Sequence, residues 1–465
     1  MISVSLIIFA FFINAFYQGD EWEKTYGGDG IDVGCSIQQT IDGYIIGGYT
    51  NSFSKDDDFD MWVLKIDSNG NEEWNATYGS NKDEECRCIR QTKNGYILVG
   101  SKRAEEESHI WVVKIDDNGN EEWNRTYGNW SMGRYIEATK DGGYIIVGWE
   151  SQEIYRQSDV LLIKIDSEGN IEWSKIYEEE DYQDGIIVHE TDDGYIIGGN
   201  TGFEHQKAMV IKVDRYGGIE WKRIYNGILS SLEIVDDGYL IVGSIRKWNA
   251  WYCYTHSDIW VLKIDSMGNI EWEKSFGTFH HENGQYGEQA SNGFIILGET
   301  YRVRSKSNFN IYGTWLIKID EDSKEEWIRR IEGVSGMKVL FSHDAFILLG
   351  IRTYYNHSDA CVIKMYEPAL RIEAIKTSIG HIFIDARNIG SKELSNINWT
   401  IYLEGMVFCN RYMQGNISIP VNESVTIGSD TIIGIGPVSI VITIGNVAKI
   451  LHFFLLGPIF LPYYL

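Results

Sequence analysis

The aromatic residues of two long loops are the strongest candidates for a binding site in this sequence. Residues 244–258 and 299–313 each join two strand-like segments, and both stretches are longer than their counterparts elsewhere in the chain. Exposed aromatic rings can stack on sugars or anchor a protein partner. The predicted binding residues are Trp248, Trp251, Tyr252, Tyr254, Tyr301 and Tyr312.

The same loops allow a second interpretation, in which their aromatic side chains pack on one another as a small loop core. Tyr354 and Tyr355 add aromatic rings to the next loop along the chain. Variable loops on one face of a repeat scaffold are the usual binding surface. The sequence alone leaves both interpretations open.

Histidines fall in expected loops, but their spacing does not support catalysis. No His-x-x-x-His pair and no nucleophile elbow accompanies them, and no Ser-His-Asp arrangement can be built from the sequence. Solvated loop histidines are the simpler interpretation. These residues are His109, His205, His256, His280, His281 and His357. We therefore expect a protein that is not an enzyme.

Two acidic patterns resemble metal or ligand sites, and each has a simpler structural explanation. The turn from Asp67 to Asn71 alternates Asp and Asn around Gly70, but the twelfth position is Tyr78 rather than the Glu of a calcium loop. Asn-Gly instead predicts a hairpin turn. Aspartates five residues before a repeated Lys either form a symmetric site or cap a strand, and capping is favoured. These are Asp60, Asp159, Asp258 and Asp359. No metal and no cofactor is predicted.

A repeat of Lys-Ile-Asp, followed after six residues by Trp, positions these loops. It first runs from Lys65 to Trp74, and the Trp-to-Trp steps are 49, 50, 48, 51 and 55 residues. A fixed period of this size indicates a propeller or a solenoid. A Gly-aromatic-aliphatic segment such as 43–46 precedes each Lys-Ile-Asp, and a more polar segment such as 36–40 precedes that. Short apolar runs between turn residues indicate strands, so each repeat should hold four.

The strand count predicts a ring that the N-terminus closes. There are seven Gly-aromatic-type strands and seven central strands, but the first Glu-Trp strand contains Trp22 and none follows Lys364. The strand near Trp22 should therefore pair with the strand near Lys364, which removes two exposed edges. The predicted fold class is all-β: a seven-bladed β-propeller closed by an N-terminal outer strand, followed by a C-terminal β-sandwich.

Composition predicts the domain boundaries. All five prolines lie at or after Pro368, and proline removes a donor from a strand ladder. Strand-like runs continue beyond this point without the repeat, over a length that suits a β-sandwich. The apolar run 450–465 is too short and too broken by proline to span a membrane, so a buried terminal strand is predicted. The predicted domains are 1–18, a signal peptide, 19–367, the propeller, and 368–465, an Ig-like β-sandwich.

The apolar N-terminus and the charge distribution limit the function. Residues 1–17 are mostly apolar, which favours a signal peptide over a misplaced start or a stray strand. Seven Asn-x-Ser/Thr sequons are compatible with export, so a secreted or cell-surface location is predicted. The formal charge of −26 lies in the repeat region and repels phosphate backbones, which argues against nucleic-acid binding. Six cysteines without a CxxC pair argue against a zinc site.

The segment from Lys65 to Trp74 resembles the tryptophan-docking repeat of quinoprotein-type propellers. It is closer still to the Gly-Gly-Tyr-Ile, Lys-Ile-Asp and Trp repeats of archaeal and bacterial surface propellers, and this resemblance covers residues 21–366. Residues 385–390 and 398–400 are similar to Ig-like modules attached to such surface proteins. The quinoprotein resemblance implies eight blades, a quinone with calcium and an adjacent Cys-Cys, whereas this chain counts seven repeats and lacks the Cys-Cys.

These features predict a non-catalytic recognition or scaffold protein, secreted or at the cell surface, that binds a glycan or a protein through propeller loops. No nucleic-acid partner, no cofactor and no integral membrane span is predicted. Two enzymatic alternatives stay open, a quinone-dependent oxidoreductase and a polysaccharide-acting enzyme in the propeller mouth.

Overall fold

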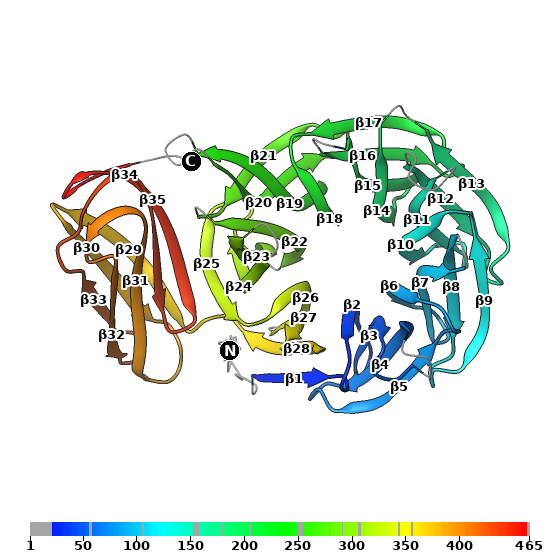
Figure 1. Ribbon diagram of the computed structural model, residues 1–465, viewed down its shortest axis with the longest axis horizontal. Helices are drawn as coiled ribbons and strands as arrows, with labels where there is room; N and C mark the ends of the chain where they lie inside the picture. Colours follow the sequence, from blue (N-terminus) through cyan, green and yellow to red (C-terminus); the bar gives the residue numbers. More distant parts are fainter. Residues whose placement is uncertain are drawn as a thin grey trace, which may run out of the picture.

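The computed structural model describes an all-β protein (Figure 1). The described residues are 21–462, without 55–57, 105–106, 152–157, 179–180, 204–205, 250–253, 279, 291, 306–307, 343–344 and 355–356. They form 36 strands and no helix, so no helix in these ranges is long and apolar enough to cross a membrane. The predicted signal peptide, residues 1–18, lies outside the described residues.

The repeats form antiparallel four-stranded sheets arranged around a ring, as in a β-propeller (Figure 1). Five of these sheets follow chain order from the inner strand to the outer strand. Their strands are β2 (Asp32–Gln39), β3 (Gly43–Thr50), β4 (Asp60–Asp67) and β5 (Glu72–Tyr78); β6 (Glu84–Gln91), β7 (Tyr96–Arg103), β8 (Ser108–Ile115) and β9 (Glu121–Tyr127); β10 (Ser131–Ala138), β11 (Tyr144–Ser151), β12 (Ser158–Ile165) and β13 (Ile171–Tyr177); β14 (Gln183–Glu190), β15 (Gly194–Thr201), β16 (Lys207–Asp214) and β17 (Ile219–Tyr225); β18 (Ile228–Val235), β19 (Gly238–Asn249), β20 (Tyr254–Asp265) and β21 (Ile270–Phe276).

The N-terminal strand completes another sheet of the ring. This sheet has the order β1-β28-β27-β26, with β1 (Trp22–Tyr26), β28 (Ser358–Tyr366), β27 (Ala345–Thr353) and β26 (Ser335–Ser342). Trp22 lies opposite Lys364 and Tyr26 lies opposite Ala360. The pairing predicted between the strands around Trp22 and Lys364 is therefore confirmed.

The sheet of the sixth repeat does not end at its outer strand. Its strands are β22 (His281–Ala290), β23 (Gly293–Ser305), β24 (Asn308–Ile319) and β25 (Glu325–Glu332). The C-terminal strands β35 (Val447–Gly457), β34 (Ile433–Ile444), β31 (Leu394–Cys409) and β32 (Tyr412–Ile419) continue it into one nine-stranded sheet, in which β36 (Ile459–Pro462) also pairs with β35. Ile328 opposite Ala448 and Arg329 opposite Val447 make the joint. The sequence pattern did not predict this continuation, because pairing between distant segments leaves no periodic trace.

The remaining C-terminal strands form a three-stranded sheet, β29 (Leu370–Ser378), β30 (His381–Asn388) and β33 (Ser424–Gly428). One hydrophobic core joins it to the continued sheet and includes the fully buried Ile384, Leu403 and Ile440. The single terminal strand predicted over 450–465 is wrong in detail. The run folds instead as the hairpin β35–β36, with Pro458 between the strands, where no ladder donor is needed.

Tryptophans of the outer strands hold neighbouring sheets together. Trp74 in β5 covers the turn glycine Gly119 of the next sheet, where an added Cβ would lie 2.9 Å from a ring carbon. The Tyr78 hydroxyl donates to the Gly119 carbonyl oxygen at 2.6 Å. Gly119 also has a φ of +82°, so the turn needs glycine for its backbone and for this close approach. The equivalent contacts are Trp22 on Gly70, Trp123 on Gly169, Trp173 on Gly217 and Trp221 on Gly268.

Candidate binding site

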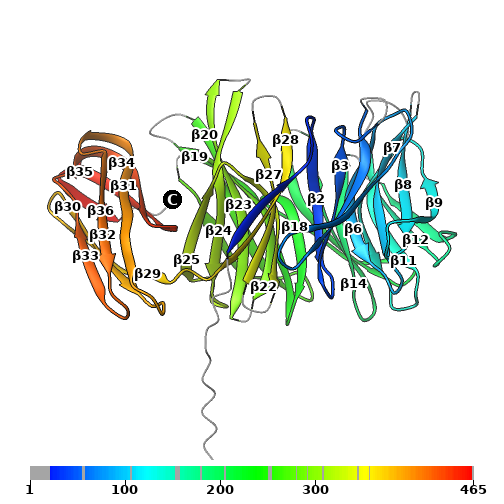
Figure 2. The ribbon, with the colours of Figure 1, turned by 90° about the horizontal axis from the view of Figure 1, so that it is seen from below.

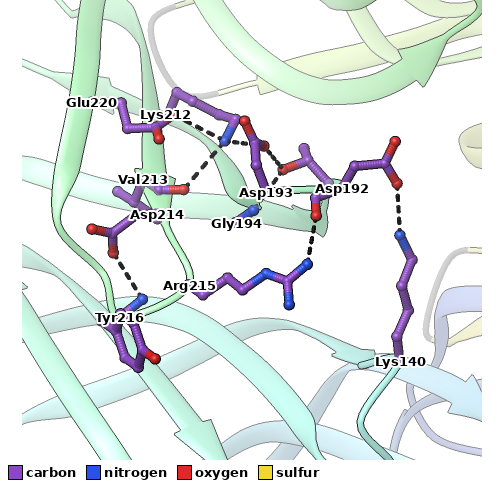
Figure 3. Close-up of polar contacts among 11 residues, drawn as sticks. Lys140, Asp192, Asp193, Gly194, Lys212, Val213, Asp214, Arg215, Tyr216 and Glu220 are labelled. Carbon is purple, nitrogen blue, oxygen red and sulfur yellow. Dashed lines mark hydrogen bonds and ion pairs between the residues drawn. The ribbon is translucent and has the colours of Figure 1, made fainter.

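The repeated charged residues hold the turns of the fold together. Lys212 in β16 is buried, and its Nζ lies 2.7 Å from Asp193 Oδ1 and 3.2 Å from Glu220 Oε2 (Figure 3). Asp214, the Asp of the same Lys-Val-Asp segment, accepts hydrogen bonds from the backbone N–H groups of Tyr216 and Gly218, each at 2.8 Å. Equivalent ion pairs join Lys65 to Asp42 and Glu73, Lys164 to Asp141 and Glu172, and Lys263 to Asp237 and Glu271. These side chains already have partners, which leaves them with a structural role.

The turn that resembles a calcium loop is a hairpin, as predicted. Asp67 Oδ1 accepts the N–H groups of Asn69 and Asn71 at 2.8 Å, and Oδ2 accepts from Asn71 Nδ2 at 2.8 Å. These hydrogen bonds, led by the backbone bond from Asn71, lower the pKa of Asp67. Across the described residues, no group of three or more His, Cys, Asp or Glu side chains is arranged to hold a metal ion.

Among the hairpins between the second and third strands of the ring's sheets, two are longer than the rest. β19 and β20 have 12 residues each, and β23 and β24 have 13 and 12, whereas β15 and β16 have 8 each. The ladder of the first hairpin stays in register to its end, where Trp248 lies opposite Thr255 and Asn249 opposite Tyr254. Both hairpins rise on the upper side of the ring in Figure 2. The long loops predicted from the sequence are therefore mostly regular strand.

The six predicted aromatics are described to different extents. Trp248 is 64% exposed. Tyr301 is half-buried, and its hydroxyl donates to the Glu299 carboxylate, which also accepts from the Ser335 hydroxyl. Tyr254 and Tyr312 belong to β20 and β24, but their side chains lie outside the described set, as do Trp251 and Tyr252 entirely. The gathering of all six into one patch stays a prediction.

Sequence reasoning missed a ring of ionisable side chains on the inner strands. These side chains occupy one equivalent ladder position, opposite the second or third residue of the neighbouring strand in five consecutive sheets. The pairs are Arg90 with Ile97, Glu137 with Ile145, His189 with Ile196, Glu233 with Leu240 and Glu288 with Ile295. The sequence did carry a usable signal, because all but Glu137 stand five residues before the Gly that precedes the aromatic residue of the next strand.

His189 links three of these inner strands. Its Nδ1 lies 2.6 Å from Glu137 Oε2, and its Nε2 lies 3.0 Å from the Leu232 carbonyl oxygen and 3.6 Å from Glu233 Oε2. Burial opposes the charged ring, but the bond to Glu137 and the charges of both glutamates outweigh it and raise the pKa of His189. Both ring nitrogens face acceptors, an arrangement that the imidazolium form satisfies.

Other side chains of the inner strands place cations beside aromatic rings. The Arg90 guanidinium lies 4.3 Å from the centre of the Tyr135 ring, and Lys338 Nζ lies 4.7 Å from that of Tyr286. Burial lowers the pKa of Lys338 to about 8 and raises the pKa of Glu288 to about 7. Such mixed groups in a poorly hydrated place can bind a polar ligand or exchange a proton.

The predicted solvation of the histidines is wrong for His256. This residue is 1% exposed, and its Nε2 lies 3.5 Å from Asp258 Oδ1. Burial lowers the pKa of His256 to about 4 and raises the pKa of Asp258 to about 7. His280 is half-buried and pairs with Glu404 of β31 at 2.8 Å. His256, Asp258 and Glu404 are therefore buried, whereas His280 stays partly exposed.

Comparisons with known proteins give only remote structural similarity. No protein-family model and no curated protein matches the sequence. Among solved structures, Sqt1 from Chaetomium thermophilum is 10% identical over 79% of this chain and 97% of that chain, with a TM-score of 0.43. Drosophila Semaphorin 1b, extracellular domains 1–2, is 9% identical over 74% and 85%, with a TM-score of 0.42. Trypanosoma rangeli sialidase in complex with sialic acid is 9% identical over 91% and 94%, with a TM-score of 0.38. The propeller-like architecture therefore rests on the strand pairing, and these similarities assign no function.

Proposed function

We propose that this chain is a non-catalytic recognition protein, secreted or at the cell surface, that binds a glycan or a protein through its long hairpins. In this proposal the ring is a seven-bladed β-propeller closed by β1, and the C-terminal strands form an Ig-like β-sandwich. The repeated charged residues stabilise the turns, and the long hairpins supply the contact surface. The proposal therefore needs no cofactor.

The observation that supports this proposal most directly is the extension of β19 and β20. Four more residues per strand than in β15 and β16 carry Trp248 to the end of the hairpin, where it is 64% exposed. Arg246 and Lys247 precede it in a chain with a formal charge of −26. An exposed indole beside basic groups is the composition of a binding hot spot, in which Trp and Arg are enriched.

Trp248→Ala tests this proposal. The full chain and the variant would be screened on an immobilised panel of glycans and extracellular proteins, and their affinities for any bound member compared. We expect a loss of about 2 kcal/mol, or roughly 30-fold, with an unchanged melting temperature. Tyr216→Ala is the matched control, because Tyr216 is 78% exposed on the turn between β16 and β17. A lowered melting temperature with unchanged affinity would contradict the proposal.

A second candidate, a polysaccharide-acting enzyme in the ring's mouth, is favoured by one observation. Burial raises the pKa of Glu288 to about 7, and the charge of Glu233 adds to that shift. Glycosidases use two carboxyl groups held in different protonation states by their surroundings. Release of reducing sugar from a polysaccharide panel, lost in Glu288→Gln, would support the enzyme. No release by the native chain would exclude it for that panel.

A further inference from the structure

A cleft between the β22–β25 sheet and the C-terminal strands has the features of a ligand site. Its volume is about 510 Å³, within the range of about 300–1,000 Å³ that small-molecule sites occupy. Residues of β24 and β25 form one wall, and residues of β31, β32 and β34 form the other. Figure 1 shows β35 beside β25, where the ring meets the C-terminal strands.

Both walls belong to one face of the nine-stranded sheet. Residues directly opposite each other in a ladder point to the same face, as do residues two apart on a strand. Arg330 lies two residues after Ile328, and Ile328 is opposite Ala448. Ala448 is opposite Thr443, and Thr443 is opposite Thr400. The cleft is therefore the hollow of a continuous sheet that bends at the β25–β35 joint.

Three hydrogen-bonding atoms of the cleft's lining residues are buried without a partner among the described residues: Trp315 Nε1, Arg330 Nε and Thr300 Oγ1. Trp315 is 3% exposed and Thr300 is 4% exposed. Arg330 Nε lies 4.0 Å from the Glu332 carboxylate, beyond hydrogen-bond range. A buried polar group without a partner costs about 1–3 kcal/mol. Three such groups around one cleft point to a ligand that completes their bonding.

The Trp315 N–H has no accepting side chain at the position that serves two equivalent tryptophans. In two other sheets the equivalent indole N–H donates to a side chain of the outer strand, to Asn124 at 3.2 Å or to Glu273 at 2.7 Å. The ladder places Ile328 at that position in β25. Ile328 cannot accept a hydrogen bond, and it forms the joint with Ala448. The equivalent tryptophans are Trp62, Trp111 and Trp260, of which Trp62 also lacks a partner for its N–H among the described residues although Asn75 stands at the accepting position.

We propose that this cleft binds a neutral sugar unit of a glycan. Tyr402 and Tyr412 lie directly opposite each other on the C-terminal wall, and aromatic rings of this kind stack on the apolar face of a sugar. Threonine hydroxyls both donate and accept, as sugar hydroxyls do. The lining carries two glutamates against one arginine, which does not favour phosphate: Glu332, Glu404 and Arg330. The proposal rests on the cleft alone and is independent of the hairpin function proposed above.

Two substitutions in the full chain test this site. Isothermal titration with tetrasaccharides of glucose, mannose, galactose and N-acetylglucosamine would identify a binding sugar. Trp315→Phe keeps an aromatic ring, although a smaller one, and removes the N–H, and Tyr412→Ala removes a ring that is 54% exposed. We expect each to weaken binding about tenfold or more. Tyr216→Ala should leave the affinity unchanged, because Tyr216 lies on an exposed turn between β16 and β17.

Two results would overturn the proposal. The first is that none of the four tetrasaccharides binds, or that binding survives both Trp315→Phe and Tyr412→Ala. The second is that Trp248→Ala abolishes saccharide binding while Tyr412→Ala does not, which would assign the sugar to the long hairpin. If Trp315→Phe lowers the melting temperature, Tyr412→Ala decides, because that exposed side chain contributes little to the core.

Discussion

The outer turns and the inner strands of the same sheets use their charged residues differently. At the outer turns the same Lys meets the same pair of carboxylates in repeat after repeat, as Lys212 meets Asp193 and Glu220. On the inner strands one ladder position holds three residue types across five sheets, Arg90 in β6, His189 in β14 and glutamate in the other three. Repetition therefore identifies the residues that build the scaffold, and departure from it identifies candidates for function.

The hairpins of the fourth and fifth repeats show the same contrast. The first ends after 8-residue strands and the second continues to 12, with an exposed Trp248 near its end. The sheets beneath them pair in the same way, so the added length is not needed for the ring. Stability should depend on the repeated parts and binding on the added ones.

The largest expected effect follows removal of residues 1–27, which deletes β1. This strand pairs with β28 at five positions, and the adjoining Glu21 carboxylate bonds Arg329 at 2.9 Å. Its loss exposes the edge of β28, so we expect little soluble, monomeric protein by size-exclusion chromatography. Removal of residues 1–18 alone is the control. An unchanged denaturation midpoint after the longer deletion would break the claim that this strand closes the ring.

A smaller effect is expected from Lys212→Met, which removes one repeated ion network. The Lys212 amine is buried, but Asp193 and Glu220 are partly exposed and stay hydrated, so the cost should be about 1 kcal/mol of unfolding free energy. Lys140→Met is the matched control, because Lys140 and Asp192 form an exposed pair and should contribute nothing measurable. Equal effects of the two substitutions in urea denaturation would remove the distinction between them.

The effect of Glu288→Gln on stability should depend on pH. Burial raises the pKa of Glu288 from 4.5 to about 7 in the folded chain. The unfolded chain therefore loses this proton first, and folding stability falls as pH rises from 4.5 through 7. Gln cannot ionise, so the variant should gain stability over the native chain at pH 8 and not at pH 4. The same difference at both pH values, measured by thermal melting, would contradict a buried neutral Glu288.

The ring was predictable from the sequence because its cause is local and repeated. The hairpin turn after Lys-Ile-Asp and the closure by the strand around Trp22 both follow from residue type and period. The joint between Ile328 and Ala448 was not predictable, because it pairs segments 120 residues apart with no shared pattern. The burial of His256 and the ionisable side chains around His189 on the inner strands were missed, because burial of a polar residue depends on neighbours from other repeats.

The missing acceptor for the Trp315 N–H in the cleft was not predicted, for a related reason. Trp315 belongs to the same repeated position as Trp111 and Trp260, and the missing acceptor for its N–H becomes visible only once the outer strand is paired with its neighbour. Only the ladder shows that Ile328 occupies the place of the accepting residue.

The measurement that tests the central claim most directly is the denaturation midpoint of two tryptophan variants beside the native chain. Trp327 belongs to the repeat and is 3% exposed, whereas Trp248 lies on the added hairpin and is 64% exposed. Trp327→Ala should lower the free energy of unfolding by about 3–5 kcal/mol, and Trp248→Ala should change it by less than about 0.5 kcal/mol. A comparable loss from both variants would show that the added hairpin is part of the scaffold and would contradict the division proposed for this protein.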